Sequence, residues 1–174
     1  IRDSDGRDLP GEQWRDQCRV GDRFYAEHTF VLHTVWITDT GSVRVTDFMP
    51  LDTQLNVVRR IEGLTGDVEM VQDLRLRFDY GRITPWISHF ASLEDPETGE
   101  IGDEELIALA GADAMVLRSE APAERIDDDN GPRHVSRFTV SAGQTRDLVL
   151  THFESHRTPP PPVDAGDELS LIHI

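Results

Sequence analysis

The sequence predicts an all-β fold, an antiparallel β-sandwich, in a chain of 174 residues. Short runs rich in β-branched and aromatic residues recur about every ten residues, and Gly-containing turn sequences separate them. The run over 70–78 alternates between two faces with a period of two, which is typical of a half-buried strand and not of a helix. The sequence contains no amphipathic helix of ordinary length, which argues against parallel α/β folds.

A β-hairpin is predicted in the first third of the chain. Residues 27–38 and 43–48 are both rich in β-branched and aromatic residues, and the sequence Asp-Thr-Gly at 39–41 lies between them. Two such runs around a short Gly turn favour a hairpin. Pro50 has no N–H to donate to a ladder, so we expect the second strand to end before it.

The middle of the chain predicts further antiparallel strands. We expect a strand over 57–64, a turn at 65–67 and a second strand over 70–78. Residues 83–90 favour another strand despite Pro85. Two more hairpins are predicted, one joining 106–109 to 115–118 and the other joining 135–140 to 147–153, with loops at 94–100 and 127–132.

These patterns divide the chain into four parts. Residues 1–23 are expected to be a polar leader, and residues 24–158 the β-sandwich. Residues 159–168 begin with four prolines, which favour a stiff polyproline II linker, and continue into an acidic helix start. We expect residues 169–174 to be a non-native tail and leave them out of the fold prediction.

The composition excludes several classes of function. The chain has 33 acidic and 17 basic residues, and its formal charge is −16. Such a surface repels phosphate backbones and anionic lipids, so we expect no nucleic-acid partner. No apolar run is long enough to span a bilayer, so we expect no membrane partner. We also expect a cytoplasmic location. Cys18 is the single cysteine, which rules out a disulfide scaffold within the chain.

Five segments, which keep their order over about residues 28–168, carry a family resemblance. They are 43–50, 59–63, 74–82 together with Pro85 and Trp86, 138–143, and the prolines at 159–162. Together they resemble the N-terminal, trehalase-like domain of glycoside hydrolase family 15, which includes the bacterial glucoamylase-like and trehalase-like proteins.

The resemblance implies a supersandwich-like accessory domain, truncated at both ends, that lacks the family's catalytic (α/α)6 toroid. In the family the toroid supplies two catalytic glutamates and inverts the anomeric centre, which requires two carboxyl groups flanking the bond. The glutamates of this chain do not match those motifs, so we carry over no catalytic residue. We therefore expect a fragment that is inactive alone and needs no cofactor. Its partner is the toroid, and the parent hydrolyses α-glucosidic bonds in trehalose or maltooligosaccharides.

The main candidate for a domain interface, or for the rim of the sugar cleft, extends from Asp79 to Trp86. Asp79 and Arg82 carry opposite charges, and the aromatic rings of Tyr80 and Trp86 can stack on a sugar or a neighbouring domain. Pro85 completes this candidate. The alternative is a purely structural turn with Trp86 in the sandwich core, and the sequence leaves both open.

Asp47 is a second candidate for a domain contact. The alternative is that its carboxylate caps a turn through its own backbone, which is common for Asp near Pro. We expect no metal site. His28 and His33 would face opposite sides of a strand, and the acidic residues 127–130 favour a solvated loop.

A rival interpretation is a stand-alone carbohydrate-binding or protein-interaction sandwich. Carbohydrate-binding modules usually display a platform of aromatic residues, and this chain has three Trp and two Tyr at scattered positions. An exposed apolar patch would support an interaction role, but a severed domain interface would expose one too.

Overall fold

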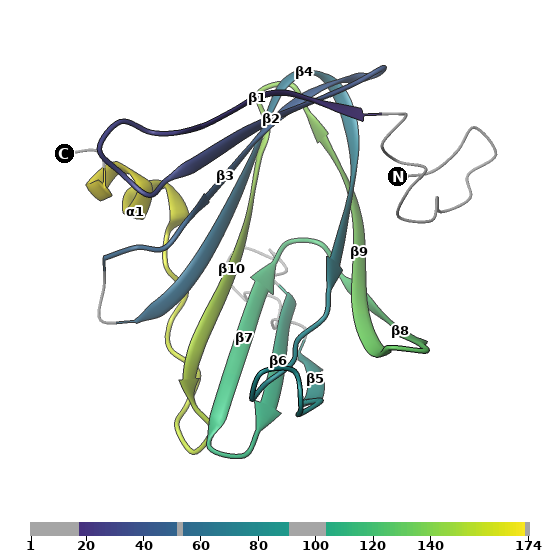
Figure 1. Cartoon of the computed structure of the whole chain (residues 1–174), viewed down its shortest axis with the longest axis vertical. Helices are drawn as coiled ribbons and strands as arrows, with labels where there is room; N and C mark the ends of the chain where they lie inside the picture. The colour runs from purple at the N-terminus through teal and green to yellow at the C-terminus, as the bar shows by residue number, and fades with distance from the viewer. Residues whose placement is uncertain (1–17, 52–53, 91–103, 173–174) are drawn as a thin grey trace, which may run out of the picture.

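The computed structural model describes residues 18–51, 54–90 and 104–172, and its strands pair in antiparallel fashion (Figure 1). The predicted all-β fold class is therefore confirmed. The strands are β1 (Cys18–Tyr25), β2 (Leu32–Thr38), β3 (Gly41–Phe48), β4 (Leu55–Leu74), β5 (Trp86–Phe90), β6 (Glu104–Ala110), β7 (Asp113–Ser119), β8 (Ala123–Asp128), β9 (Gly131–Ser141) and β10 (Thr145–Glu154), and the helix is α1 (Ala165–Ile172).

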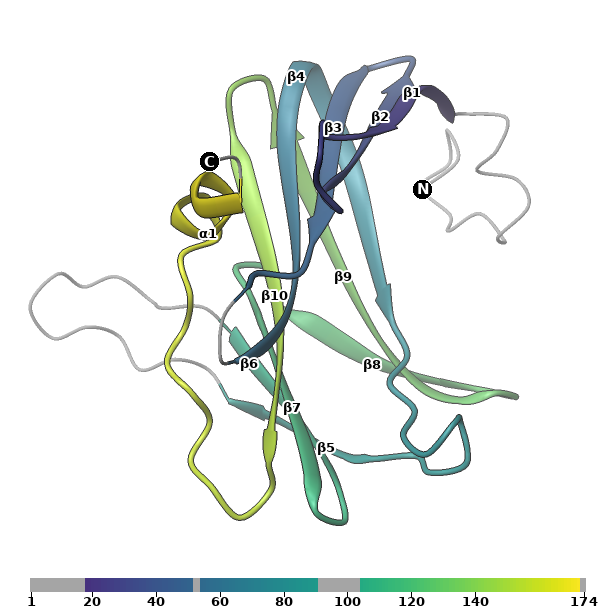
Figure 2. The ribbon, with the colours of Figure 1, turned by 60° about the vertical axis from the view of Figure 1, so that its left-hand side comes forward.

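The strands form two sheets that share β4. The large sheet has the order β1-β2-β3-β4-β10-β7-β6-β5, and the small sheet consists of the second half of β4 followed by β9 and β8. Within the described residues, β1 and β5 lie at opposite edges of the large sheet, so the sheet is not closed into a barrel. Figure 2 shows the two sheets diverging from the bend of β4.

Strand β4 is 20 residues long and passes from one sheet to the other. Its residues 55–62 pair with β10, whereas residues 67–74 pair with β9. Gly66 lies between these stretches in the left-handed conformation, with φ of 60°, which glycine adopts without steric cost. Figure 1 shows β4 rising, bending over at the top and descending. The turn predicted at 65–67 is therefore wrong, because the chain bends into the second sheet and does not form a hairpin.

The hairpin predicted over 135–153 is also wrong. Strands β9 and β10 pair with successive stretches of β4 and not with each other. At the bend between them, the N–H of Gly63 donates to the carbonyl of Gln144, and the N–H of Gly143 donates to the carbonyl of Gly63, both at 2.9 Å. The same turn residues suit a hairpin or a bend, and pairing with β4 decides between them.

The strand predicted over 70–78 is right only up to Leu74, where β4 ends, and of the loop predicted at 127–132 only residues 129–130 lie outside strands. The loop predicted at 94–100 lies outside the described residues. The remaining predicted strands agree with the structure. The first hairpin is β2–β3 and ends before Pro50, the hairpin over 106–118 is β6–β7, and β5 lies within 83–90. Strand β8 was not predicted, and residues 18–23, assigned to the polar leader, belong to β1. Seven of the eight β1 residues are exposed, so the segment carries no apolar pattern, and its pairing with β2 makes it a strand.

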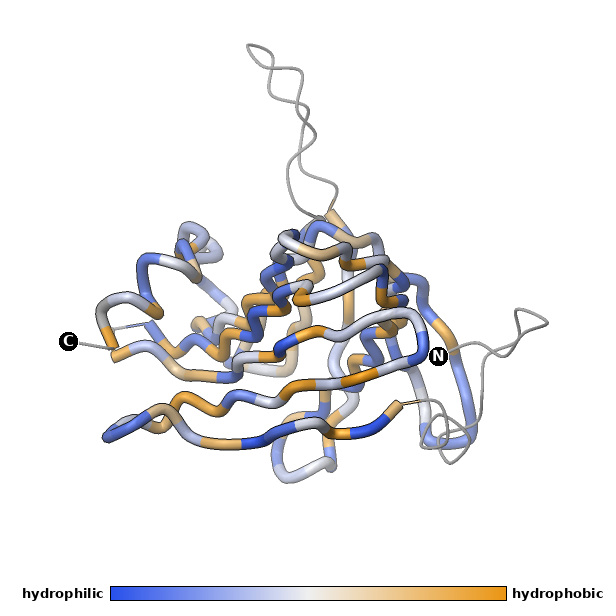
Figure 3. Tube along the Cα trace, turned by 90° about the horizontal axis from the view of Figure 1, so that it is seen from above, coloured by the Kyte–Doolittle hydropathy of each residue, from blue (hydrophilic) through white to orange (hydrophobic). Residues whose placement is uncertain are grey.

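The main core lies between the two sheets next to the bend. Each of its six buried side chains is at most 8% exposed. Hydrophobic and hydrophilic residues alternate along the strands (Figure 3), which gives each sheet an apolar inner face. The sheets also meet on the β5 side, where the rings of His89 and His134 lie 5.1 Å apart. The core residues are Val43, Val45, Ile61 and Leu148 from the large sheet, and Val68 and Val140 from the small sheet.

The C-terminal segment covers the outer face of the large sheet. The carboxylate of Asp164 accepts hydrogen bonds from the N–H groups of Gly166 and Asp167 at 2.8 and 2.9 Å, which caps α1 at its start. The helix continues through the described part of the predicted tail. It packs through Ala165, Leu169 and Ile172 against a second buried cluster that includes Val31, Phe48, Val58 and Val149. In the part of the chain that the structure describes, no helix has the length and apolarity needed to cross a membrane.

Candidate functional site

Away from the bend, the inner faces of the two sheets enclose a cleft of about 670 Å³, which we call the inter-sheet cleft. The large sheet contributes residues of β1, β2, β3, β4, β7 and β10, and the small sheet contributes residues of β4 and β9. The volume is in the range of pockets that hold small molecules or short segments. Most of the lining is apolar and includes Trp36, Val45, Ile61, Met70, Phe138 and Leu150.

Asp47 and Arg59 form an ion pair that lines this cleft. They lie opposite each other on β3 and β4, and the Nε and Nη2 atoms of Arg59 donate to the two carboxylate oxygens of Asp47 at 2.6 and 3.0 Å. These hydrogen bonds raise the pKa of Arg59 above its ordinary value. The side chains of Asp47 and Arg59 are 31% and 55% exposed, so water reaches both. The carboxylate makes a cross-strand pair, and the alternative that it caps a turn is wrong.

Several lining residues were not identified as site residues from the sequence. Trp36 and Phe138 place aromatic rings in the cleft from β2 and β9. The Oε1 atom of Gln72 is buried without a hydrogen-bond partner within the described residues. These residues lie far apart in the chain, and the bend of β4 brings them together. Only the alternation over 70–78 indicated that Gln72 shares a face with the apolar residues.

A strained turn follows β4. Phe78 and Ile83 close it through two backbone hydrogen bonds of 2.9 and 3.1 Å. Between them, Asp79, Tyr80 and Gly81 have φ values of 47°, 53° and 90°. Left-handed backbone costs a non-glycine residue about 1–2 kcal/mol, and such conformations cluster at functional segments. The turn therefore fixes the backbone that carries Tyr80, at a cost in stability.

This turn and the start of β5 expose two aromatic rings. Tyr80 is fully exposed and Trp86 is 70% exposed, whereas Pro85 is buried and anchors the segment between them. Arg82 and Asp79 approach to 3.8 Å, with side chains 78% and 47% exposed, so their ion pair is weak. The alternative that placed Trp86 in the sandwich core is wrong. We call Tyr80 and Trp86 together the aromatic pair.

Asp47 and the aromatic pair belong to different sites. The large sheet places β4, β10, β7 and β6 between β3, which carries Asp47, and β5, which begins with Trp86. Five spacings of about 4.8 Å correspond to about 24 Å along the sheet. The structure thus brings together Asp79, Tyr80, Arg82, Pro85 and Trp86 in one segment, and places Asp47 in the inter-sheet cleft.

Acidic residues near the β8–β9 turn bind arginines of the chain itself. The carboxylate of Asp128 accepts two hydrogen bonds from Arg75, at 2.9 and 2.5 Å, and one from the N–H of Asn130. These contacts lower the pKa of Asp128 to about 2. The Nη1 atom of Arg133 lies 2.6 Å from Asp73 on β4. Among the described residues, no group of three or more His, Cys, Asp or Glu is placed to hold a metal ion.

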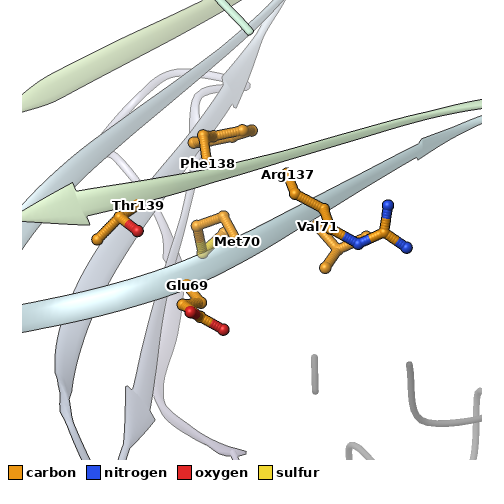
Figure 4. Close-up of a pocket in the computed structure, with 6 residues that line it drawn as sticks. All are labelled: Glu69, Met70, Val71, Arg137, Phe138 and Thr139. Atoms are coloured by element: carbon orange, nitrogen blue, oxygen red, sulfur yellow. The ribbon is translucent and has the colours of Figure 1, made fainter. Parts of the chain in front are cut away.

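A smaller hollow of about 160 Å³ lies along the pairing of β4 with β9 (Figure 4). Glu69 is directly opposite Thr139, Met70 opposite Phe138, and Val71 opposite Arg137. Glu69 is exposed, whereas Met70 is half-buried and packs against the core, so the two faces of this strand differ in chemistry.

No family model matches the chain, and no curated protein matches it. The resemblance to glycoside hydrolase family 15 therefore stays a prediction that depends on the five motif segments.

Proposed function

We propose that this chain is the non-catalytic N-terminal domain of a family 15 glycoside hydrolase, and that it packs on the (α/α)6 toroid and shapes its sugar cleft. The parent enzyme hydrolyses α-glucosidic bonds in trehalose or maltooligosaccharides with inversion. The five motif segments support the family. The single cysteine fits a reducing compartment, and we place the parent in the cytoplasm.

The exposure of the aromatic pair is the observation that carries the docking role. Tyr80 and Trp86 leave large rings in water, and the turn before β5 has backbone strain at two non-glycine residues, one of which is Tyr80. Tyr and Trp are enriched at protein interfaces because each buries a large apolar area and has a polar group for a hydrogen bond. A domain surface that covers both rings would recover this apolar area.

The environment of the candidate carboxylates supports a non-catalytic role. An inverting hydrolase needs a protonated carboxyl group on one side of the bond and a carboxylate base on the other. Asp47 is bound to Arg59, and Asp79 faces Arg82. Asp47 and Asp79 also lie in different sites of the chain, so they do not flank one bond as the pair of an inverting enzyme must.

The test begins with the gene and continues with the longer protein. We expect the reading frame at the genomic locus to continue past Glu168 into a helical domain with two catalytic glutamate motifs. In that protein, replacing Tyr80 and Trp86 by Ala should lower the thermal midpoint of the toroid and its rate of trehalose or maltotriose hydrolysis. Phe30→Ala, which alters another highly exposed aromatic residue in the β1–β2 connection, is the control.

Two results would overturn the proposal. One is a reading frame that ends at Ile174. The other is a longer enzyme whose midpoint and activity are unchanged in the Tyr80/Trp86 double variant, or after deletion of the sandwich.

A stand-alone carbohydrate-binding sandwich is the second candidate. The observation that favours it is the inter-sheet cleft, where Trp36 and Phe138 lie in the same pocket as the Asp47–Arg59 pair. Titration of the isolated chain with maltotriose and trehalose by calorimetry separates the two candidates. Saturable heat that Trp36→Ala abolishes favours sugar binding, and its absence favours the accessory domain.

A further inference from the structure

The small sheet has an open edge beside the inter-sheet cleft. Within the described ranges, residues 67–74 of β4 pair with β9 on one side and with no strand on the other, and only the N–H of Asp67, at the start of this edge, donates to the carbonyl of Thr40 at 3.3 Å. Figure 1 shows β9 and β8 lying to one side of this descending half of β4. An edge strand presents unpaired N–H and C=O groups and is a template for another strand.

The same edge borders the apolar cleft. Consecutive residues Met70, Val71, Gln72, Asp73 and Leu74 all line it, so the strand's backbone as well as one of its faces adjoins the space. Across the cleft lie side chains of β2 and β3, including Trp36 and Val45. Farther along the small sheet, past β4, His134 of β9 contacts His89 of β5. The two sheets thus meet on the β5 side, and the β1–β3 part of the large sheet faces the cleft.

The two faces of this edge strand differ in chemistry and so determine which side chains a strand paired with it should carry. Val68 is 2% exposed and Met70 packs against the core, so this face is apolar and points inward. Asp67, Glu69 and Asp73 are exposed on the opposite face. Residues opposite each other on neighbouring strands interact favourably when both are apolar or when their charges are opposite. A complementary strand therefore alternates between apolar and basic residues.

We propose that the small sheet accepts an additional β-strand from a second polypeptide at residues 67–74 of β4. The bound segment is extended, lays its apolar side chains into the inter-sheet cleft against Trp36 and Val45, and places Lys or Arg beside Asp67 and Glu69. Main-chain hydrogen bonds to the edge supply affinity, and the alternating pockets supply specificity. This surface is separate from the aromatic pair, so the proposal does not depend on the docking role of Tyr80 and Trp86.

Charge argues against a second copy of this chain as the occupant. Two β4 edges paired with each other would place Asp67, Glu69 and Asp73 beside one another, and like charges on neighbouring strands are destabilising. Each chain also carries a formal charge of −16, which opposes self-association. A basic segment is attracted by the same charge.

The probe is a fluorescein-labelled heptapeptide in which lysine and valine alternate. The control peptide has the same composition with its lysines grouped at one end, so that it keeps the charge and loses the alternation. We expect fluorescence polarisation at physiological salt to show saturable binding of the alternating peptide, and at least about tenfold weaker binding of the control. Amide hydrogen exchange of the full chain by NMR locates the site. Alternate amides of 68–74, beyond the Asp67 N–H that donates to Thr40, exchange fast in the free chain and slow down on binding.

Matched variants connect the binding to the edge strand. Glu69→Lys reverses an exposed charge on β4, and Glu124→Lys makes the same change on β8. We expect Glu69→Lys to weaken binding by about fivefold and Glu124→Lys to change it less than twofold. Both substitutions alter exposed side chains, and circular dichroism checks that the fold is kept.

Four results would overturn the proposal. They are equal affinity for the two peptides, slowed exchange confined to residues outside 67–74, amides of 67–74 that are all protected in the free chain, and a dimer of the chain that excludes the peptide. In none of these cases is the edge of β4 a receptor for a basic strand from a partner.

Discussion

Asp47 and Arg59 lie opposite each other on β3 and β4, and a bidentate ion pair joins their side chains at the inter-sheet cleft. The two residues are 12 positions apart and lie on different strands, so the sequence alone does not reveal that they pair. The pair neutralises two of the charges that line an otherwise mostly apolar cleft.

The stability that this pair contributes should be small. Because both side chains reach water, we expect a double-mutant cycle with Asp47→Asn and Arg59→Gln to give a coupling of about 0.5 kcal/mol, and the coupling should fall as salt is added. Urea denaturation monitored by Trp fluorescence measures it. Arg44 and Glu62, 3.7 Å apart and similarly exposed on the other face, provide a comparison pair that should couple more weakly. A coupling above about 2 kcal/mol would mean that the cleft is closed to water.

The bend of β4 depends on Gly66. A Cβ atom at this position would lie 2.0 Å from the carbonyl oxygen of Thr40, and the residue has a positive φ. Gly143 also has a positive φ, but a Cβ atom there would meet nothing within 4 Å. We therefore expect Gly143→Ala to cost about 1 kcal/mol of unfolding free energy and Gly66→Ala at least about 3 kcal/mol. Equal losses in urea denaturation would show that the backbone at Thr40 relaxes freely.

The local pattern predicted most strands but not how they are arranged. Alternation along 70–78 and the Gly turn at 39–41 depend on neighbouring residues, so the strand and the first hairpin could be predicted. Gly66 and Gly143 suit a tight turn or a bend, and which of the two forms depends on pairing between residues 60 to 74 positions apart. The two wrong turn predictions share this cause, whereas β1 was missed because its exposed residues carry no apolar pattern and its pairing with β2 makes it a strand.

The candidate sites divide in the same way. Asp79 to Trp86 is one continuous segment, and its turn residues and aromatic rings could be identified from the local sequence alone. The inter-sheet cleft combines Trp36, Arg59 and Phe138, which only the shared strand β4 brings together. No motif spacing links such residues, so the cleft could not be predicted before the topology was known.

The low pKa of Asp128 leads us to expect that the folded chain loses stability in acid. Its pKa is about 2 in the folded chain, below the ordinary 3.8, because Arg75 and the Asn130 N–H bind the ionised form. A lowered pKa adds stability above the unfolded value, and this contribution disappears as the pH falls from about 4 to about 2. We expect wild type to exceed Asp128→Asn in stability at pH 5 and to equal it near pH 2. Thermal denaturation across this range measures the difference, and Arg75→Gln should remove the larger part of it, because the Asn130 N–H still binds the carboxylate. A gap between wild type and Asp128→Asn that persists at pH 2 would contradict this linkage.

The proline segment is fixed to the sandwich by a buried arginine. Arg118 on β7 is 6% exposed, and it donates to Glu105 on β6 and to the carbonyl of Pro160, each at 2.7 Å. Removing the guanidinium leaves the Glu105 carboxylate without its partner and releases the segment that leads to α1. We expect Arg118→Met to cost about 3 kcal/mol, the low end for a broken buried pair, because Glu105 is still 29% exposed.

A second measurement separates the two contacts of Arg118. Glu105→Gln keeps an acceptor for the guanidinium and leaves its bond to Pro160, so it should cost only about 1 kcal/mol. In limited proteolysis, Arg118→Met should speed cleavage between residues 157 and 164, whereas Glu105→Gln should not. If both variants were cleaved at the wild-type rate, packing of α1 on Phe48 and Val58 would hold the segment without help from Arg118.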